Sequence, residues 1–200
     1  MQSHFLIITG MSGAGKTQVV RTLEDLNFFC IDNLPATLIP KFAELCRQTS
    51  EEKVALVVDI RGGRFFDKLL QVLDEMEASG QKYELLFLDA SDATLVRRYK
   101  ETRRRHPLGE RNTLLKNITC ERELLDPLRE KATHIIDTST LTTAQLKAKV
   151  TEMFGEGSSK ERMGIVVRSF GFKHGLPLDS DLVLDVRFLP NPFYVEELRN

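Results

Sequence analysis

One eight-residue segment near the N-terminus constrains the fold and the chemistry of this chain more than any other. Residues 10–17 read Gly-Met-Ser-Gly-Ala-Gly-Lys-Thr and match the pattern G-x-x-x-x-G-K-S/T at every fixed position. An apolar run at residues 5–8 has the length of a buried parallel strand, and apolar side chains recur at helical spacing over residues 19–26. The motif therefore lies between a predicted strand and a predicted helix, which is the context that a phosphate-binding loop requires.

The residue types of this motif suit the binding of a nucleotide's phosphates. Glycines allow the backbone to turn its N–H groups inward and to approach a ligand closely, and the following helix adds the positive end of its dipole. We expect Lys16 to reach the β- and γ-phosphates and the Thr17 hydroxyl to ligate Mg²⁺. The predicted nucleotide-binding residues of the loop are Gly10, Met11, Ser12, Gly13, Ala14, Gly15, Lys16 and Thr17.

Length and composition exclude several classes of protein. The 200 residues allow one large domain, or one domain and part of another, and a net charge of −1 gives no overall attraction to nucleic acid or membrane. Three scattered cysteines without a C-x-x-C pair argue against a disulfide framework and against a zinc site. No run approaches about 18 apolar residues and no signal peptide precedes the first strand, so we expect a cytoplasmic protein without a membrane partner.

Strands and helices are predicted to alternate over residues 1–154. Strand-like runs at residues 28–31, 54–59, 83–88 and 134–137 are separated by segments with helical periodicity. Residues 142–145 form a predicted capping box for a final helix that ends near Met153. This alternation indicates an α/β fold: a kinase-like P-loop NTPase with a doubly wound parallel sheet and helices on both faces.

Two acidic residues end predicted strands and compete for the role of the Walker B acid, the carboxylate that reaches the Mg²⁺ shell. Asp59 ends the longer apolar run, and the glycine turn at residues 60–63 lets the chain approach phosphate. Asp89 more simply begins a turn in which Ser91 or Asp92 caps the next helix. We therefore favour Asp59 as a metal ligand.

A cluster of basic residues follows the fourth predicted strand. Its members are Arg97, Arg98, Lys100, Arg103, Arg104 and Arg105, and His106, Pro107 and Leu108 come next. The cluster fits a solvated helix face, an arginine lid that stabilises transition-state charge, or a surface that holds an RNA backbone. The sequence leaves these interpretations open. Together with Lys16 and Asp59, the residues Arg103 and Arg104 are the predicted catalytic residues.

A further helix, rich in charges, is predicted over residues 109–131. Its acids Glu121, Glu123 and Asp126 are available to pair with the arginines of the basic cluster. We expect these acids to have a structural role and no catalytic one.

The composition changes after residue 154. Residues 155–162 are rich in glycine, serine and charged side chains and are predicted to be a linker. Two strand-like runs follow, at residues 163–172 and 181–189, around a polar turn. Because about 40 residues are too few for an independent core, we expect residues 163–200 to be the N-terminal fragment of a second α/β domain, after a nucleotide-binding domain at residues 1–154.

Two motifs stand out in this C-terminal segment, Ser-Phe-Gly-Phe-Lys-His-Gly at residues 169–175 and Asp-Val-Arg-Phe-Leu-Pro-Asn-Pro at residues 185–192. They resemble motifs of the RapZ family of bacterial P-loop nucleotide-binding proteins, the RNase adapter proteins that are called YvcJ in Gram-positive bacteria. The resemblance covers the whole chain and includes residues 10–17, 30–35, 59–61, 86–90, 97–99, 102–104 and 106–108. It implies ATP binding at residues 10–17, with weak ATPase and GTPase activity. It also implies GTP binding or readout by Asp59, Ile60, Arg61 and Gly62.

The resemblance also implies macromolecular partners. Enterobacterial members of the family bind a small regulatory RNA and present it to an endoribonuclease, which tunes glucosamine-6-phosphate synthesis. Ligand and RNA binding there depend largely on the C-terminal domain, and the family proteins are homo-oligomers. This sequence ends at Asn200, before the later glycine-rich, basic segment of that domain. We therefore expect the RNA, endoribonuclease and oligomer contacts to depend on a region outside the sequence.

The leading hypothesis is a nucleotide-binding regulatory protein with slow hydrolysis of ATP and GTP, because the sequence offers no dedicated base for the attacking water. A small-molecule or nucleoside-monophosphate-type kinase also fits, since it would place an acid after the second strand, at Asp32, and a basic lid after the fourth strand. A third hypothesis is an RNA-binding module that uses the basic cluster and in which the nucleotide is only structural.

Overall fold

The computed structural model describes residues 4–49, 53–58, 63–109, 113–155, 166–178, 180–189 and 194–198. The chain divides into two compact units, Met1–Ser159 and Lys160–Asn200. The first unit contains the strands and helices that position the phosphate-loop motif at residues 10–17. The described part of the second unit contains short turns.

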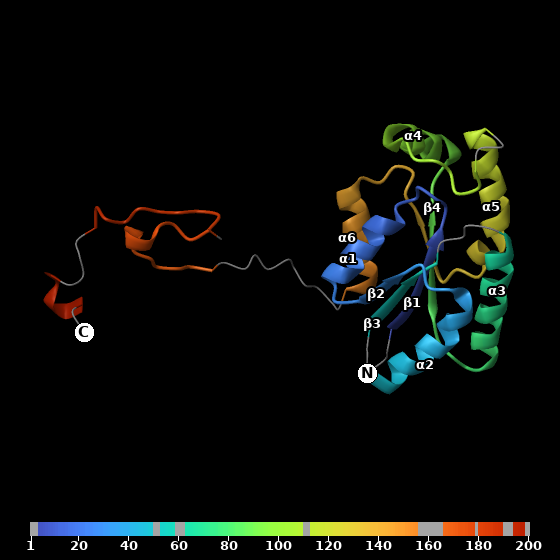
Figure 1. Ribbon diagram of the computed structural model, residues 1–200, viewed down its shortest axis with the longest axis horizontal. Helices are drawn as coiled ribbons and strands as arrows, with labels where there is room; N and C mark the ends of the chain where they lie inside the picture. Colours follow the sequence, from blue (N-terminus) through green and yellow to red (C-terminus); the bar gives the residue numbers. More distant parts are fainter. Residues whose placement is uncertain are drawn as a thin grey trace. The chain divides into compact units, whose positions relative to one another are not determined.

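Five parallel strands form the centre of the described part of the first unit (Figure 1). They are β1 (His4–Gly10), β2 (Phe29–Asp32), β3 (Lys53–Val57), β4 (Glu84–Asp89) and β5 (His134–Asp137). Their order in the sheet is β2-β3-β1-β4-β5, so the strand that leads into the motif is the central one. In the registers of this strand, Ile8 lies opposite Val57 and Gly10 opposite Leu88. Because every pairing is parallel, the C-terminal ends of all these strands meet at one edge of the sheet.

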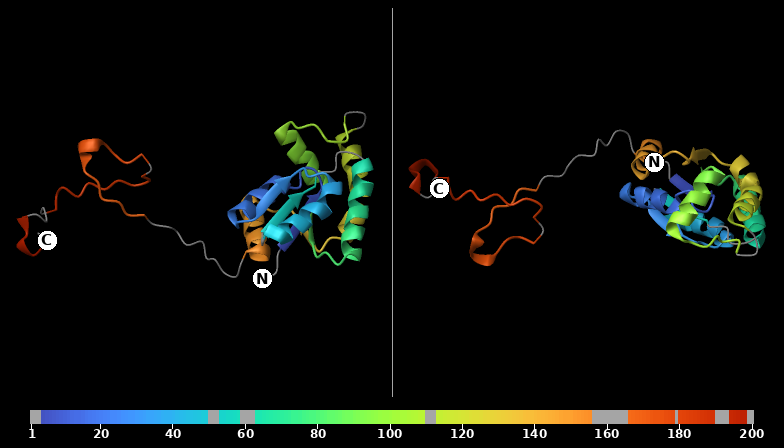
Figure 2. Two further views of the ribbon diagram at one scale, coloured as in Figure 1. Left: turned by 60° about the horizontal axis from the view of Figure 1, so that its bottom comes forward. Right: turned by 90° about the horizontal axis from the view of Figure 1, so that it is seen from above.

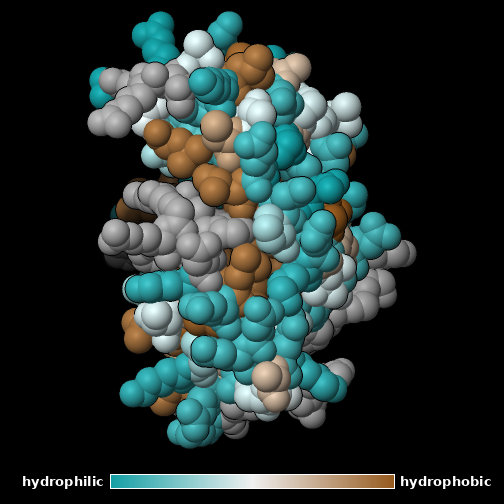
Figure 3. Space-filling view, turned by 90° about the vertical axis from the view of Figure 1, so that its right-hand side faces the viewer, coloured by the Kyte–Doolittle hydropathy of each residue, from teal (hydrophilic) through white to brown (hydrophobic). Residues whose placement is uncertain are grey.

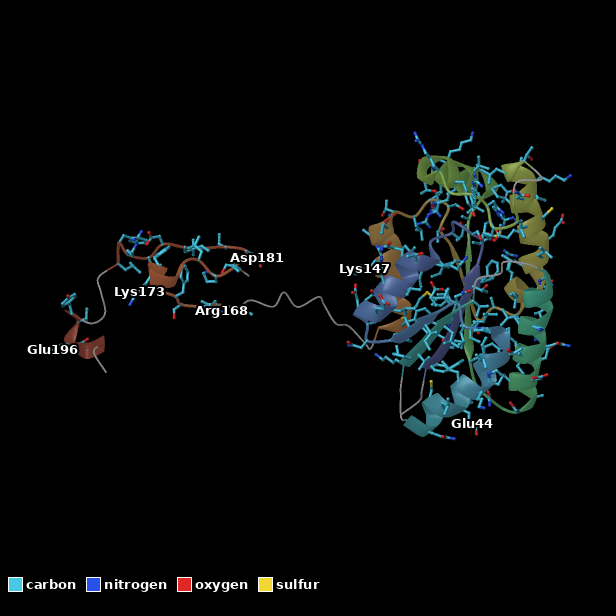
Figure 4. All side chains as sticks on the ribbon, viewed as in Figure 1. Glu44, Lys147, Arg168, Lys173, Asp181 and Glu196 are labelled. Atoms are coloured by element: carbon cyan, nitrogen blue, oxygen red, sulfur yellow. The ribbon has the colours of Figure 1, made fainter. Side chains whose placement is uncertain are left out.

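Helices cover both faces of this sheet (Figure 1), and Figure 2 shows the same layers from two further directions. They are α1 (Lys16–Asp25), α2 (Ile39–Thr49), which follows the short turn η1 (Ala36–Leu38), α3 (Gly63–Ala78), α4 (Asp92–Thr102), α5 (Leu114–Glu130) and α6 (Thr143–Phe154). Helices α1 and α6 lie side by side on one face, and α3 and α5 lie on the other. Lys147 of α6, labelled in Figure 4, donates to Asp25 at the end of α1 at 3.0 Å. The doubly wound α/β fold predicted from the sequence is confirmed.

The core lies between the sheet and its two helical layers. Leu6, Ile7 and Ile8 are buried in succession, as expected for a strand that is covered on both faces. The helices contribute one apolar side each, such as Val19 and Leu23 of α1, which are fully buried. The outward surface that α3 and α5 present is mostly hydrophilic, with smaller hydrophobic patches (Figure 3). Within the described ranges, no helix is both long enough and apolar enough to cross a membrane.

Local signals in the sequence fix several helix ends. Ser91 accepts from the Thr94 N–H and caps α4, as one of the two residues considered for that role. The predicted capping box is present, because Thr142 and Gln145 each accept the other's backbone N–H, at 3.2 and 2.9 Å. Helix α5 begins at Leu114, later than predicted, because Thr113 caps its first turn.

The second unit differs from its sequence prediction. Its described residues form the short turns η2 (Phe172–His174) and η4 (Glu196–Leu198), and the strand-like runs predicted at residues 163–172 and 181–189 form no strand in the parts that are described. Val167, Leu178 and Leu184 are 90%, 105% and 70% exposed. An alternating apolar pattern stabilises a strand only where a partner strand and a core can receive the apolar side chains, and the described residues of this segment provide neither.

Candidate functional site

The phosphate-loop motif connects β1 to α1 at the edge where the parallel strands end. Gly10, Gly13 and Gly15 have φ angles of 133°, 89° and 107°, in the region that favours glycine. Gly15 directly precedes α1 and offers no side-chain oxygen to cap its first turn. This is the arrangement found where the N-terminus of a helix binds an anion.

The side chains of the loop divide into two groups. Met11 and Ala14 are fully buried, so only their backbone can contribute to a ligand site. Lys16 is half-buried, and its Nζ donates to the carbonyl oxygens of Gly10 at 2.8 Å and Met11 at 3.3 Å. Thr17 lies exposed on the first turn of α1. The ammonium group of Lys16 is therefore folded over the backbone of the loop.

Gly10 has a structural requirement that is independent of any ligand. A Cβ atom at this position would lie 2.1 Å from the backbone oxygen of Leu88 in the neighbouring strand β4. The Met11 N–H donates to the same oxygen at 2.9 Å. The first glycine of the motif thus permits the close approach of two backbones, whereas a Cβ at Gly13 would meet side-chain atoms at 3.5 Å or more.

Two residues far along the chain hold the carbonyl groups of the loop. From α4, the Arg98 guanidinium donates to Gly13 O at 3.0 Å and to Thr138 O at 2.7 Å. The Thr138 hydroxyl, which follows β5, donates to Ala14 O at 2.8 Å. Partial burial lowers the pKa of Arg98, and the nearby charge of Arg97 lowers it further. Arg98, one of the basic cluster, thus supports the backbone of the loop.

Glu121 of α5 contacts the loop directly, which sequence reasoning missed. Glu121 is 4% exposed, and its carboxylate accepts from Ser12 twice, from the N–H at 3.2 Å and from the hydroxyl at 2.5 Å. His106 Nε2 lies 3.2 Å from the other side of this carboxylate. The sequence had suggested that Glu121 pairs with the basic cluster. A usable signal was its place in the apolar stripe of α5, at helical spacing from the buried Ile118 and Leu125.

Asp89, the second candidate for the Walker B acid, forms ion pairs with arginines of α5. Arg122 donates to Asp89 at 2.6 Å and to Asp92 at 2.7 Å, and Arg129 approaches the second oxygen of Asp89 at 3.5 Å. These ion pairs are what a structural carboxylate at the end of β4 would make. Asp59, Ile60, Arg61 and Gly62 lie outside the described residues.

The described backbone places the chain that leads to Asp59 beside the loop strand. The Val58 N–H donates to Ile8 O at 2.9 Å, and the Thr9 hydroxyl donates to Val58 O at 3.2 Å. The chain therefore leaves β3 next to β1, at the edge that carries the motif. No group of three or more His, Cys, Asp or Glu side chains that could hold a metal ion occurs in the described ranges.

The remaining predicted catalytic residues, Arg103 and Arg104, lie exposed just beyond α4. Arg103 ends this helix in the left-handed conformation, with a φ of 51°. Arg104 precedes His106, the partner of Glu121, by two positions. These arginines are therefore connected to the loop through the chain, by the buried contact of His106 with Glu121, which the sequence did not indicate.

A cavity of about 780 Å³ lies away from the loop. Its lining includes Phe5, Glu84 and His134, which stand at the beginning of β1, β4 and β5. It therefore opens at the opposite edge of the sheet and contains no residue of the motif.

Comparisons with known proteins agree with this architecture. Residues 3–158 match the family model of the RapZ-like N-terminal domain, and residues 163–200 match that of the RapZ C-terminal domain. A nucleotide-binding protein of Clostridium botulinum is 57% identical over 198 residues, which cover 98% of this chain and 67% of the relative. A nucleotide-binding protein of Clostridium kluyveri is 55% identical over 199 residues, covering 98% of this chain and 68% of the relative.

Solved structures show the same fold at low sequence identity. The shikimate kinase of Acinetobacter baumannii in complex with shikimate aligns with a TM-score of 0.51 at 19% identity, over 76% of this chain and 93% of that one. The shikimate kinase of Bacteroides thetaiotaomicron aligns with a TM-score of 0.50 at 21% identity, over 75% of this chain and 96% of that one. Both family models and the curated relatives show that the chain belongs to the RapZ family, and its first unit shares the fold of these shikimate kinases.

Proposed function

We propose that the chain binds the Mg²⁺ complexes of ATP and GTP at residues 10–17 and hydrolyses them slowly. The observation that carries this proposal is the shape of the loop. Its left-handed glycines lead into the N-terminus of α1, beneath a lysine whose Nζ lies 2.8 Å from Gly10 O. Backbone N–H groups, a helix dipole and an ammonium group together suit a chain of phosphates. The relatives named nucleotide-binding proteins support the same ligand class.

Each site residue has a role in this proposal. Lys16 moves from the loop carbonyls to the β- and γ-phosphates, and the Thr17 hydroxyl and the Asp59 carboxylate hold Mg²⁺, directly or through water. Thr17 fits that role because its side chain is exposed on the first turn of α1 and oxygen is the ligand that Mg²⁺ prefers. When bound, Mg²⁺ neutralises charge on the phosphate oxygens. Ile60, Arg61 and Gly62, which follow Asp59, contribute to GTP binding or readout.

Slow turnover is part of the proposal. Glu121 lies close to the loop, but Ser12 and His106 already donate to its carboxylate. A carboxylate held in this way is poorly suited to take a proton from an attacking water. Arg103 and Arg104, exposed beyond α4, would neutralise charge that develops on the transferred phosphoryl group.

We extend the proposal to the regulatory role that membership of the family suggests. The protein would act in the cytoplasm as a homo-oligomeric adapter that presents a small regulatory RNA to an endoribonuclease. Arg103, Arg104 and Arg105 are exposed and offer positive charge to an RNA backbone. The chain spans about two thirds of the length of its relatives, so these partners concern the whole protein.

The test is a titration of ATP and GTP in the presence of Mg²⁺, with hydrolysis measured on the same samples. We expect Lys16→Ala to weaken binding by about 100-fold, because it removes the charged hydrogen-bond donor to the phosphates. Lys68→Ala is the matched control, since Lys68 lies exposed on α3. Unchanged binding by Lys16→Ala would contradict the proposed site.

Measurements on the same samples distinguish hydrolysis of the nucleotide from transfer of its phosphoryl group to a metabolite. Slow release of phosphate that requires Lys16 and no added metabolite supports the regulatory NTPase. Tight binding without hydrolysis, followed by phosphorylation of an acceptor when pooled metabolites are added to labelled ATP, would make the protein a small-molecule kinase instead.

A further inference from the structure

A buried chain of contacts connects the phosphate loop to the segment between α4 and α5. Ser12, Glu121 and His106 form this buried triad and are 9%, 4% and 7% exposed. Ser12 donates to Glu121 from its N–H and its hydroxyl, and His106 Nε2 lies 3.2 Å from Glu121 Oε2. Three separate parts of the chain therefore meet at one carboxylate.

The hydrogen bonds around His106 define how protons are arranged in the triad. The Leu108 N–H donates to His106 Nδ1 at 3.2 Å, and a ring nitrogen that accepts carries no hydrogen. The hydrogen of the neutral ring therefore lies on Nε2 and is donated to Glu121. With donors from Ser12 and His106 on both oxygens, Glu121 has the surroundings of an ionised carboxylate, which accepts only.

The buried triad restricts the backbone of the glycine-rich part of the phosphate loop. Residues 10–15 contain three glycines, which have more conformational freedom to lose than any other residue. Glu121 fixes the Ser12 N–H on one side of Gly13, while Arg98 and Thr138 hold the carbonyls of Gly13 and Ala14. A loop that is already ordered loses less conformational entropy when a ligand binds.

The triad also reaches the exposed arginines. His106 follows Arg105 directly, and its ring lies 5.2 Å from the ring of Tyr99. Tyr99 in turn lies next to Gly13, since a Cβ built there would be 3.5 Å from Tyr99 Cε2. The segment that carries Arg103 and Arg104 is therefore packed against the back of the loop through two side chains.

We propose that Glu121 is a positioning residue for nucleotide binding, held by His106, and that this contact couples the loop to the basic segment at residues 103–105. The proposal rests on the proposed function and deepens it. It names Glu121 as the residue that orders the phosphate loop, and residues 103–105 as the segment that responds when a nucleotide binds. Glu121 touches the loop from behind through Ser12. Its effect on the ligand is therefore indirect, and coupling between the two regions is reciprocal.

The direction in which removal of Glu121 changes nucleotide affinity distinguishes a positioning role from electrostatic repulsion of the phosphates. A buried negative charge beside the loop repels phosphate, so its removal would tighten binding if repulsion dominated. Loss of positioning has the opposite result and weakens binding. In Glu121→Gln the new amide must turn its NH₂ group either toward the Ser12 N–H or toward His106 Nε2–H, so one donor faces another. We therefore expect glutamine to restore affinity only in part.

The first experiment is a set of nucleotide titrations with a fluorescent ATP analogue and Mg²⁺, well below the melting temperature of each variant. We expect Glu121→Ala to weaken binding about 10-fold and Glu123→Ala, an exposed neighbour on the same helix, to change it less than about 2-fold. In a Ser12→Ala background the effect of Glu121→Ala becomes smaller, because the two residues act through one contact. Tighter binding, or a lower melting temperature with unchanged affinity, overturns the proposal.

The second experiment is amide hydrogen exchange, which measures the order of the loop without any nucleotide. We expect faster exchange at Gly13 and Gly15 in Glu121→Ala than in the wild type, with α6 unchanged. Added nucleotide should then slow exchange at residues 103–109 in the wild type but not in the variant. If the wild type binds no nucleotide, the proposed function fails, and exchange at the glycines still decides whether Glu121 orders the loop. Equal exchange in both proteins overturns the proposal.

Discussion

Arg98 and Gly13 lie 85 positions apart in the sequence, and the Arg98 guanidinium donates to the Gly13 carbonyl oxygen at 3.0 Å. The same group donates to the Thr138 carbonyl oxygen at 2.7 Å and to the Thr138 hydroxyl at 3.0 Å. A planar guanidinium can reach several acceptors at once, which a lysine ammonium in that place cannot do with the same geometry. One side chain of α4 therefore joins the phosphate loop to the end of β5.

Replacing Arg98 should destabilise the fold and weaken nucleotide binding together. In Arg98→Ala the two carbonyl oxygens lose their donors, and we expect a loss of about 1–3 kcal/mol in the free energy of unfolding. Arg97→Ala is the control, because the exposed Arg97 pairs with Glu101 only at 3.9 Å and such pairs contribute less than about 1 kcal/mol. Urea unfolding and nucleotide titration check both variants. Equal losses in the two would show that Arg98 has no special role.

Two glycines of the loop should respond very differently to an added methyl group. Both have positive φ, but a Cβ at Gly10 would lie 2.1 Å from Leu88 O, whereas a Cβ at Gly13 would meet Tyr99 at 3.5 Å. We expect Gly10→Ala to lose more than about 4 kcal/mol or to fail to fold. Gly13→Ala should lose about 1–2 kcal/mol, the cost of a left-handed alanine. Urea unfolding measures both, and similar losses would rule out the backbone clash as the cause.

The two candidate Walker B acids can be separated by paired substitutions. Asp59→Asn should abolish Mg²⁺-dependent hydrolysis and leave the melting temperature nearly unchanged. Asp89→Asn removes the charge that Arg122 and Arg129 contact, so it should cost about 1–3 kcal/mol of stability and retain Mg²⁺-dependent hydrolysis. Hydrolysis assays across Mg²⁺ concentrations, beside thermal melts, provide the comparison. The reverse pattern would assign the metal to Asp89.

The thiol of Cys30 should react slowly at neutral pH. Burial of the thiol, together with the smaller effect of the negative charge of Glu24, raises its pKa to about 11. Since only the thiolate is a nucleophile, alkylation of the folded protein should be slow at pH 8 and should accelerate as the pH rises toward 11. Unfolding in urea should make the reaction fast at pH 8. Mass spectrometry of the Cys30 peptide measures each rate, and equal rates in the folded and unfolded chain would contradict the raised pKa.

The order of strands and helices in the first unit could be predicted from the sequence because its signals are local. Runs of consecutive apolar residues mark strands that are buried on both faces, and helical spacing marks the layers that cover them. The cap of α6 lies within residues 142–145, so its partners are neighbours in the chain. In the second unit, prediction from local patterns fails. Its apolar runs predicted strands, but Val167 and Leu184 remain exposed because a pattern alone supplies no surface to pack against.

Residues 10–17 by themselves determined where the candidate site lies and which chemistry suits it, since a glycine-rich turn before a helix is a local property of the backbone. Only the tertiary structure decided what holds that turn in place. Its partners Arg98, Glu121 and Thr138 stand 85, 109 and 124 positions away from Gly13, Ser12 and Ala14 respectively. Hydrogen bonds over such separations form where α4, α5 and β5 are packed around the loop. Periodicity shows that a helix packs against the sheet, but it does not show which of its polar residues will meet the loop.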